Sequence, residues 1–307
     1  MNQTMNADTQ EPVSADTLEP VSAQVSSGSR RRRRMWRAMK RNKTTLVGLV
    51  LTTLILLVAL FAPWLVPFDP VQQNLMKGDM PPGAEHVLGT DSFGRDVLSR
   101  IIMGARVSLG IALSAVGMAL IFGSTLGVVA GYKGGAIDTA TVRLTDLLMT
   151  FPTTILGLMV LAVLGSGMVN LSIAIAIAIT PRFARIARGS AIALRERDFI
   201  QGARALGMSD ARIICKHVLP NISNEVLVVA SLWTATAILQ EANLSFIGLG
   251  VKPPTPSWGG MIRDGVNQLL NQPWLSIAPG AAIFAVVLAF NMIGDGLRDI
   301  LDPRTMD

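Results

Sequence analysis

Long uncharged segments separated by short polar ones form the dominant pattern of the chain. Each long segment approaches the roughly 20 residues that, at about 1.5 Å per residue, cross a hydrocarbon core of about 30 Å. The uncharged run 147–181 is divided by a turn at Gly165, Ser166, Gly167 and Asn170. The pattern predicts an all-α polytopic membrane protein with six transmembrane helices. They are expected near residues 45–66, 105–131, 140–164, 169–188, 222–244 and 276–296.

The polar segment between the fourth and fifth predicted spans has a helical pattern of its own. Apolar residues recur at helical spacing and predict one apolar stripe. They are Ile192, Phe199, Ala203 and Leu206. A second, polar face is lined by Arg197, Gln201 and Arg204.

The same segment contains signals that end and restart a helix. Gly207 stands where a left-handed residue would end the first helix, and Ser209 can cap a second helix beginning at Asp210. That second helix is expected to end by Pro220, because proline lacks an N–H group and restricts the residue before it. We therefore predict a bent pair of short basic helices, for which a plain connector is the alternative on pattern alone.

Composition supports a membrane location. Half of the 307 residues are hydrophobic, 16% are charged and the mean hydropathy is +0.46, whereas typical chains carry about 25% charged residues. The net charge of +6 and the pI of about 10.1 could indicate nucleic-acid binding, but the basic residues flank the predicted spans. The single cysteine, Cys215, excludes an internal disulfide and most metal sites, and is expected to be a small packing residue.

The chain begins with a polar stretch and then becomes strongly basic. Residues 1–29 are expected to be disordered, and nine lysines or arginines follow between residues 30 and 43. A polybasic block beside an apolar run fixes membrane orientation and contacts anionic lipid; it is too extended for a cleaved signal peptide. With the N-terminus inside, all but six of the 27 basic residues fall on the cytoplasmic side. We expect a polar tail and basic cytoplasmic arm at 1–43, a transmembrane domain at 44–307 and both termini in the cytoplasm.

The polar segment carries a family resemblance. The segment resembles the cytoplasmic signature of permease subunits of ATP-binding-cassette (ABC) importers, which reads acidic-Ala-Ala, then Gly, then Ile-x-Leu-Pro. The corresponding residues here are Gln201-Gly202-Ala203, Gly207 and HVLP at 217–220. In that family the helix before the glycine seats in a cleft of the ATPase and transmits its motion. Gln201 replaces the family's glutamate, which favours a lever defined by shape over an ionic contact. The resemblance assigns ATPase coupling to Gln201, Gly202, Ala203, Arg204, Ala205, Leu206, Gly207, Met208, Ser209 and Asp210.

The loop after the first span has a more specific motif. Residues 86–100 read HVLGTDSFGRDVLSR, in which Asp91, Arg95 and Asp96 could pair locally, while Asp96 and Arg100 have the i,i+4 spacing that supports a helix. A solvated loop with a surface helix is the alternative. The stretch resembles the corresponding loop of the dipeptide, oligopeptide and nickel branch of these permeases. The motif residues are Gly89, Thr90, Asp91, Gly94, Arg95 and Asp96.

A second predicted external loop points to the same branch. Residues 244–259 read LSFIGLGVKPPTPSWG, in which three prolines predict a rigid, irregular loop. This loop and the ending at 289–304 resemble the same permeases, so the resemblance covers about residues 37–304. Trp258 and Trp274 are expected to be interfacial anchors.

The resemblance implies a C-type permease subunit of a bacterial inner-membrane importer that moves peptides by alternating access. Nickel chelates, glutathione and opines are alternative substrates. The implied partners are a second related permease, two ABC ATPases, an extracytoplasmic binding protein and membrane lipid, without nucleic acid. An ion-driven secondary transporter and a membrane scaffold are the alternatives from other classes.

Missing motifs limit the chemistry of the chain itself. Without G-x-x-x-x-G-K-[ST], ATP and magnesium are expected on partner subunits, and this chain is expected to hold no cofactor or metal and to catalyse no reaction. His86 and His217 are expected on opposite sides of the membrane, too far apart to share one site.

Charges within the predicted spans are candidates for function. Glu241 is interpreted as a gate or pathway residue, with an interfacial residue that pairs with a neighbouring chain as the alternative. Asp146 is expected to pair with Arg143 at i,i+3. The remaining intramembrane arginines are expected to reach the cytoplasmic interface by snorkelling. They are Arg182, Arg185 and Arg188.

Overall fold

The computed structural model describes residues 43–301, and the side chains up to residue 298. The expectations for the polar tail and most of the basic arm lie outside the described residues. Within them the fold is helical, as predicted. The elements are α2 (Lys43–Leu65), η3 (Leu75–Lys77), α3 (Val97–Lys133), α4 (Gly135–Thr150), α5 (Thr153–Leu164), α6 (Met168–Arg195), α7 (Asp198–Ala205), α8 (Asp210–Ile213), η4 (Ile214–Val218), α9 (Leu219–Phe246), α10 (Trp258–Gly265), η5 (Val266–Gln268) and α11 (Trp274–Leu301).

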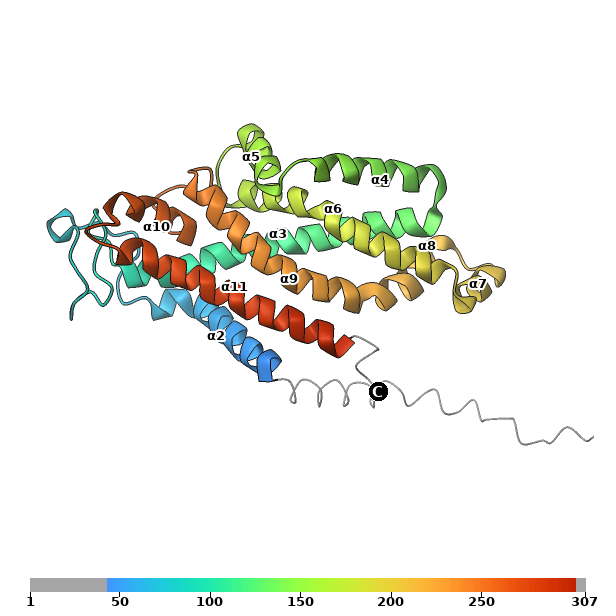
Figure 1. Cartoon of the computed structure of the whole chain (residues 1–307), viewed down its shortest axis with the longest axis horizontal. Coiled ribbons are helices and arrows are strands. Elements are labelled where there is room, and N and C mark those ends of the chain that lie inside the picture. Colours follow the sequence, from blue (N-terminus) through green and yellow to red (C-terminus); the bar gives the residue numbers. More distant parts are fainter. Residues whose placement is uncertain (1–42, 302–307) are drawn as a thin grey trace, which may run out of the picture.

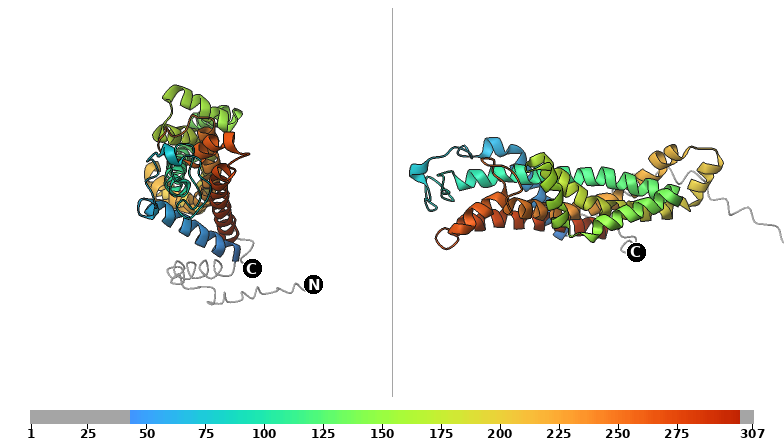
Figure 2. Two further views of the ribbon diagram at one scale, coloured as in Figure 1. Left: turned by 90° about the vertical axis from the view of Figure 1, so that its left-hand side faces the viewer. Right: turned by 90° about the horizontal axis from the view of Figure 1, so that it is seen from above.

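The helices form an elongated bundle whose two ends carry different features (Figure 1). The loop before α3 and the short helix α10 lie at one end, and α7 and α8 lie at the other (Figure 2, right). Five of the described helices are long and apolar enough to cross a membrane, or six if the bent pair α4 and α5 forms one span. The loop motif at 86–100 and the hairpin that contains Gly207 therefore lie at opposite ends of the bundle.

Glycines bring the two central helices, α3 and α6, into close contact. Gly123, Gly127 and Gly131 recur every four residues on one face of α3. A Cβ built at Gly127 would lie 2.1 Å from the carbonyl oxygen of Ala184 in α6. Small residues at this spacing let transmembrane helices approach closely, which strengthens van der Waals packing in the absence of a hydrophobic driving force. The glycine repeat is a sequence signal for this close contact of α3 with α6.

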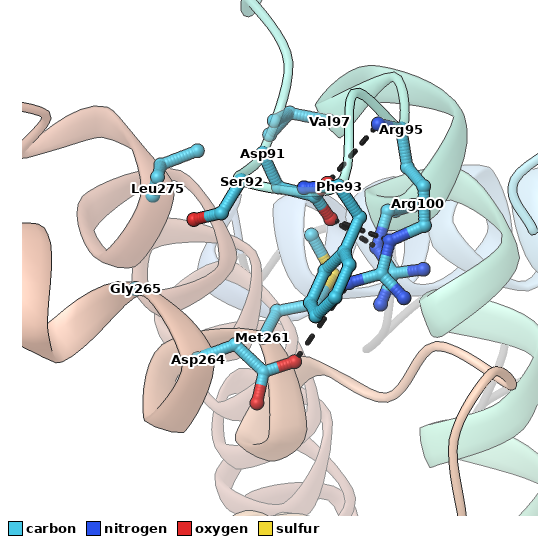
Figure 3. A pocket seen from close by; sticks show the side chains of 10 residues that line it. All are labelled: Asp91, Ser92, Phe93, Arg95, Val97, Arg100, Met261, Asp264, Gly265 and Leu275. Carbon is cyan, nitrogen blue, oxygen red and sulfur yellow. Dashed lines mark hydrogen bonds and ion pairs between the residues drawn. The ribbon is translucent and has the colours of Figure 1, made fainter. Parts of the chain in front are cut away.

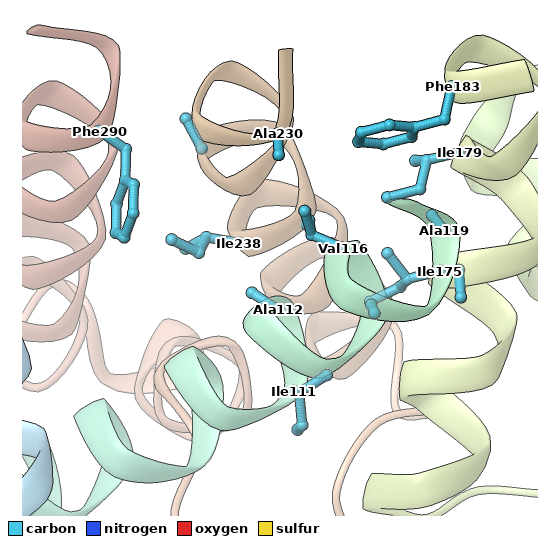
Figure 4. Close-up of a cluster of buried hydrophobic side chains, with 14 of the residues drawn as sticks. Ile111, Ala112, Val116, Ala119, Ile175, Ile179, Phe183, Ala230, Ile238 and Phe290 are labelled. Atoms are coloured by element: carbon cyan, nitrogen blue, oxygen red, sulfur yellow. The ribbon is translucent and has the colours of Figure 1, made fainter. Parts of the chain in front are cut away.

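Branched and aromatic side chains fill the space between α3, α6, α9 and α11 (Figure 4). The buried cluster includes Ile111, Ala112, Val116, Ala119, Ile175, Ile179, Phe183, Ala230, Ile238 and Phe290. In contrast, much of α2 is exposed and apolar, as expected for a helix that faces lipid. The core therefore holds α3, α6 and α9 together, and α2 lies at the periphery.

The third predicted span is broken near its middle. Residues 140–164 were expected to form one helix, but α4 ends at Thr150 and α5 begins at Thr153, and their axes are bent by 95°. Phe151 is extended, with φ −85° and ψ 136°, because the ring of Pro152 disfavours helical geometry in the preceding residue. The break therefore follows from a local sequence signal that a hydropathy pattern does not record.

The helix that contains Pro220 continues where it was predicted to end. The chain is helical from Asp210 to Phe246, and Pro220 lies in the first turn of α9. Immediately before it, Ile214–Val218 forms a π-helical turn. A wider turn relieves the clash between a proline ring and the carbonyl four residues earlier. The prediction was wrong because the sequence pattern allowed for a helix end but not for this local widening.

Candidate functional site: a hairpin and a buried loop at opposite ends of the bundle

The hairpin at α7 and α8 has a buried face and an exposed apolar tip. Ile200 is 0% exposed and Ala203 is also buried, whereas Phe199 is exposed and Leu206 is 88% exposed. The predicted single apolar stripe was wrong because the helix stops at Arg195 and restarts at Asp198. The buried face anchors α7 to the bundle, and the tip remains free for another molecule.

Gly207 ends α7 as predicted. Its φ is +75°, in the left-handed region that favours glycine. Gly207 N–H donates to the carbonyl of Arg204 at 3.0 Å, and Met208 N–H donates to that of Ala203 at 3.1 Å, which is the Schellman arrangement. Ser209 precedes α8 as expected, but its side chain makes no capping hydrogen bond.

Two polar side chains of α7 connect the hairpin to the central helices. The amide of Gln201 donates to the carbonyl of Arg195 at the end of α6, at 2.9 Å. Arg204 Cζ lies 5.3 Å from the centroid of the Tyr132 ring near the end of α3. A glutamate at position 201 could not donate the first of these bonds, so Gln201 has a structural role of its own. Cys215, predicted to be a packing residue, is exposed.

The loop before α3 is organised around the carboxylate of Asp91 (Figure 3). Asp91 Oδ2 lies 2.7 Å from Arg95 Nε and 3.4 Å from Arg100 Nε. Asp91 Oδ1 accepts the backbone N–H groups of Phe93 and Arg95, each at 3.0 Å. Both arginines are 4% exposed. The alternative of a solvated loop is therefore wrong, and Arg100 pairs with Asp91 rather than with Asp96.

The other motif residues hold this loop against the start of α3. Asp96 is the N-cap of α3: its side chain accepts from Ser99 N–H at 2.7 Å and lies 2.9 Å from His86 Nδ1. Thr90 Oγ1 accepts from Met80 N–H at 3.0 Å. Gly89 and Gly94 have φ of +73° and +69°, and Gly94 lies against the backbone of Asn74. The motif therefore encodes a compact structure at this end of the bundle.

A pocket separates this loop from α10 and the start of α11 (Figure 3). It is lined by Asp91, Ser92, Phe93, Arg95, Val97, Arg100, Met261, Asp264, Gly265 and Leu275. Asp264 lies across it from Arg95, with 4.0 Å between Asp264 Oδ2 and Arg95 Nη2. The pocket lies between the two loops that the sequence analysis predicted to be external.

The second loop is fixed by Trp258. This side chain is 2% exposed, its Nε1 donates to the carbonyl of Ile101 at 3.0 Å, and its backbone N–H donates to Ser108 Oγ at 3.3 Å. Gly104 provides room for the indole ring. The prediction of an interfacial anchor was wrong for Trp258, because its ring packs from the start of α10 against α3.

Glu241 lies inside the subunit beneath this loop. It is 0% exposed and accepts a hydrogen bond from Ser245 Oγ at 2.8 Å. Ser108 of α3 and Ser257, the N-cap of α10, face the same carboxyl group. Glu241 therefore lies where α9, α3 and α10 meet in this conformation, and among the described residues its Oε2 has no hydrogen-bond partner.

The charges between α4 and α6 pair differently from the prediction. Asp146 Oδ1 lies 2.7 Å from Arg185 Nη2, rather than pairing with Arg143. Arg188 Nη2 donates to Asp138 Oδ2 at 2.7 Å. Arg182 Cζ lies 4.6 Å from the centroid of the Trp233 ring. Each of these arginines contacts a neighbouring helix, and their snorkelling to the cytoplasmic interface stays a prediction. Across residues 43–298, no three metal-ligating side chains gather at one place.

Comparisons with known proteins agree with this architecture. The family model described as binding-protein-dependent transport system inner membrane component matches residues 123–307, and the N-terminal TM domain of oligopeptide transport permease C matches residues 31–82. A solved structure of the methionine ABC transporter MetNI in inward-facing conformations matches with a TM-score of 0.53 and 15% sequence identity. The match covers 66% of this chain and 97% of the chain in that structure, and it shows the fold alone.

Full-length relatives refine the family. The dipeptide transport system permease protein of Alkalihalophilus pseudofirmus is 46% identical, over 89% of this chain and 90% of its own length. A putative peptide transport system permease protein of Brucella abortus is 42% identical, over 87% and 90%. The glutathione transport system permease protein of Pectobacterium atrosepticum is 39% identical, over 89% and 91%. The chain therefore belongs to the family of binding-protein-dependent transport system inner membrane components, as an ABC importer permease of the dipeptide and oligopeptide branch.

Proposed function

We propose that the substrate of this permease is a short peptide. The observation that carries the proposal is the 46% identity with a dipeptide permease over 89% of the chain. Glutathione is the second candidate, because a glutathione permease is 39% identical over an equal share of the chain.

Uptake by the assembled transporter in proteoliposomes tests the substrate. A labelled dipeptide, a longer peptide and glutathione would each be supplied with the cognate binding protein, and ATP would be present on the ATPase side. ATP-dependent accumulation of the dipeptide is expected. Accumulation of glutathione alone would replace the proposal with its alternative, and uptake of none of the three would reject both.

We also propose the partners and orientation that the sequence implied. A second related permease completes the membrane pore, two ATPases hold ATP and magnesium inside the cell, and a binding protein docks outside. This chain holds no cofactor and catalyses no reaction. The basic arm within 1–43 and both termini are cytoplasmic, and 44–307 forms the transmembrane domain. Protease accessibility of tags at each terminus in right-side-out vesicles, together with co-purification, tests these assignments.

The hairpin is proposed to couple ATP binding to transport. Its exposed tip supports this role, because an 88% exposed Leu206 on an otherwise anchored element suits insertion into a partner's cleft. Gln201 and Arg204 connect it to the ends of α6 and α3. The 37 residues of α3 lead from there to the Asp91 cluster at the external end. Coupling also requires that the ATP-bound partner bind one permease state more tightly than the other.

Glu241 is proposed as a gate between the external loop and the pathway. It is enclosed by α9, α3 and α10, so access to it requires α10 to move away from α3. Cross-linking Ser257 to Ser108 through engineered cysteines should then stop uptake, and reduction should restore it. Undiminished uptake by the cross-linked transporter would reject this role.

A further inference from the structure

We propose that Arg182 of α6 binds the carboxylate of the transported peptide within the membrane; this inference rests on the proposed peptide substrate. With a rise of about 1.5 Å per residue, Arg182 lies about 21 Å along α6 from its first residue, Met168. Trp233, which contacts it, lies about 20 Å along α9 from Phe246 at the same end of the bundle. Both side chains therefore lie in the interior of helices that are long and apolar enough to cross a membrane.

Arg182 differs from the two arginines that follow it on α6. Asp146 pairs with Arg185 and Asp138 with Arg188, so α4 neutralises both. For Arg182, the described residues 43–298 supply no carboxylate partner. Charged side chains inside a membrane span are rare and face either a partner or an aqueous pathway. The positive charge of Arg182 is therefore available to an anion that is not part of the described chain.

The guanidinium is held in place by neutral groups. Its Nη1 donates to the carbonyl of Ala178 at 3.3 Å, and its Nη2 donates to Thr153 Oγ1 at 3.3 Å. Its Cζ lies 4.6 Å from the centroid of the Trp233 ring, which stabilises a cation through the electron-rich ring face. Beside Thr153, Thr154 Oγ1 donates to Gln240 Oε1 at 3.0 Å. These contacts orient Arg182 without cancelling its charge.

The chain is not helical between α4 and α5, close to Arg182. The non-helical residues, Phe151 and Pro152, lie next to Thr153 and therefore next to Arg182. Irregular backbone at membrane depth is tolerated only where it is buried in protein or lines a water-filled cavity. In transporters, broken helices of this kind often bind substrate, with the positive N-terminus of a half-helix directed at an anionic group. No side chain caps the N-terminus of α5.

A carboxylate is the anion that matches this group. The planar guanidinium can donate two parallel hydrogen bonds to the two carboxylate oxygens, a stronger arrangement than a neutral contact. Arg182 is only half-buried, so such a ligand could reach it. Every peptide with a free C-terminus carries one carboxylate there, which makes Arg182 a binding point independent of the peptide's side chains.

The test compares one dipeptide with its C-terminal amide in the full reconstituted transporter, each supplied at a concentration that saturates the binding protein. Arg182→Gln should lower uptake of the free dipeptide about tenfold or more, the effect of losing one charged hydrogen-bonded contact. Uptake of the amide should change by less than about twofold, since it lacks the charge that Arg182 binds. Arg185→Gln, one turn away in an exposed ion pair, is the matched control and should alter neither rate.

Equal losses for both peptides would overturn the proposal and indicate that Arg182 pairs with a carboxylate of the second permease. No loss for either would also overturn it. If wild-type uptake of the amide is too slow to measure, Arg182→Lys decides, because it keeps the charge but not the two-bond geometry. Its uptake of the free dipeptide should lie clearly between wild type and Arg182→Gln, and a loss equal to that of Arg182→Gln would contradict the proposal. Wild-type uptake of the dipeptide separately tests the substrate assignment.

Discussion

Gly127 of α3 lies so close to Ala184 of α6 that a Cβ at Gly127 would be 2.1 Å from the Ala184 carbonyl oxygen. Backbone, rather than a flexible side-chain end, occupies the space, so the helices themselves would have to separate. The packing of α3 on α6 therefore depends on the absence of a single methyl group, six residues before α3 ends at Lys133.

Gly127→Ala should consequently destabilise the protein. Overpacking of this kind costs about 1–3 kcal/mol, and the expected result is a lower melting temperature of the purified complex in detergent. Gly110→Ala is the matched control on the same helix, because no atom lies within 4 Å of a Cβ at that position. Its melting temperature should be unchanged or slightly higher. Equal melting temperatures for the two variants would show that α3 and α6 can separate freely.

Gly207 provides a test of the hairpin's shape. Gly207→Ala keeps the N–H that donates to Arg204 but places a side chain at φ +75°, which costs about 1–2 kcal/mol. Gly207→Pro removes the donor and cannot adopt this φ at all. Peptide-stimulated ATP hydrolysis should be reduced in the alanine variant and abolished in the proline variant. Gly189→Ala, within α6 and with open space around its Cβ, is the control and should hydrolyse ATP normally. Normal stimulation in a correctly inserted Gly207→Pro complex would reject the role of the turn.

Leu206 tests the contact with the ATPase separately from the fold. Because its side chain is 88% exposed, Leu206→Asp should leave the melting temperature unchanged. An interface anchor placed in a partner's cleft is worth about 2 kcal/mol or more, so stimulated ATP hydrolysis should fall at least about tenfold. Leu206→Met, which stays apolar and flexible, should retain most activity. Full activity in Leu206→Asp would remove Leu206 from the proposed interface.

The long-range pattern of the sequence predicted the helical fold well, because uncharged length and basic flanks are properties of a whole segment. The separation of the two motif regions to opposite ends of the bundle followed from the same pattern. Local backbone features were predicted less evenly. The end of α7 at Gly207 was predicted correctly from the position of the glycine. The continuation of the helix through Pro220 was not predicted, because it depends on a π-helical turn that no residue pattern indicates.

The partners of charged residues were the least predictable part of the candidate site. Spacing along the chain suggested Asp96 for Arg100 and Arg143 for Asp146, whereas the structure pairs Arg100 with Asp91 and Asp146 with Arg185. In the first case Asp96 is occupied as the N-cap of α3. In the second, the bend after α4 determines which residues of α6 it meets. The local pairing of Asp91 with Arg95, which the sequence also suggested, is confirmed, whereas the partners of Arg100 and Asp146 depend on tertiary packing.

Asp91 provides a test of the stability of the loop before α3. Asp91→Ala would leave Arg95 and Arg100, each 4% exposed, without their nearest carboxylate, and breaking a buried ion pair in this way costs about 3–5 kcal/mol. Asp264, 4.0 Å from Arg95, can compensate only in part. A clearly lower melting temperature and faster proteolysis of the loop at 70–96 are expected. Glu85→Ala, which removes the exposed pair with Lys77, should change neither measurement, because exposed pairs contribute little. Equal stability of both variants would mean that the loop does not depend on Asp91.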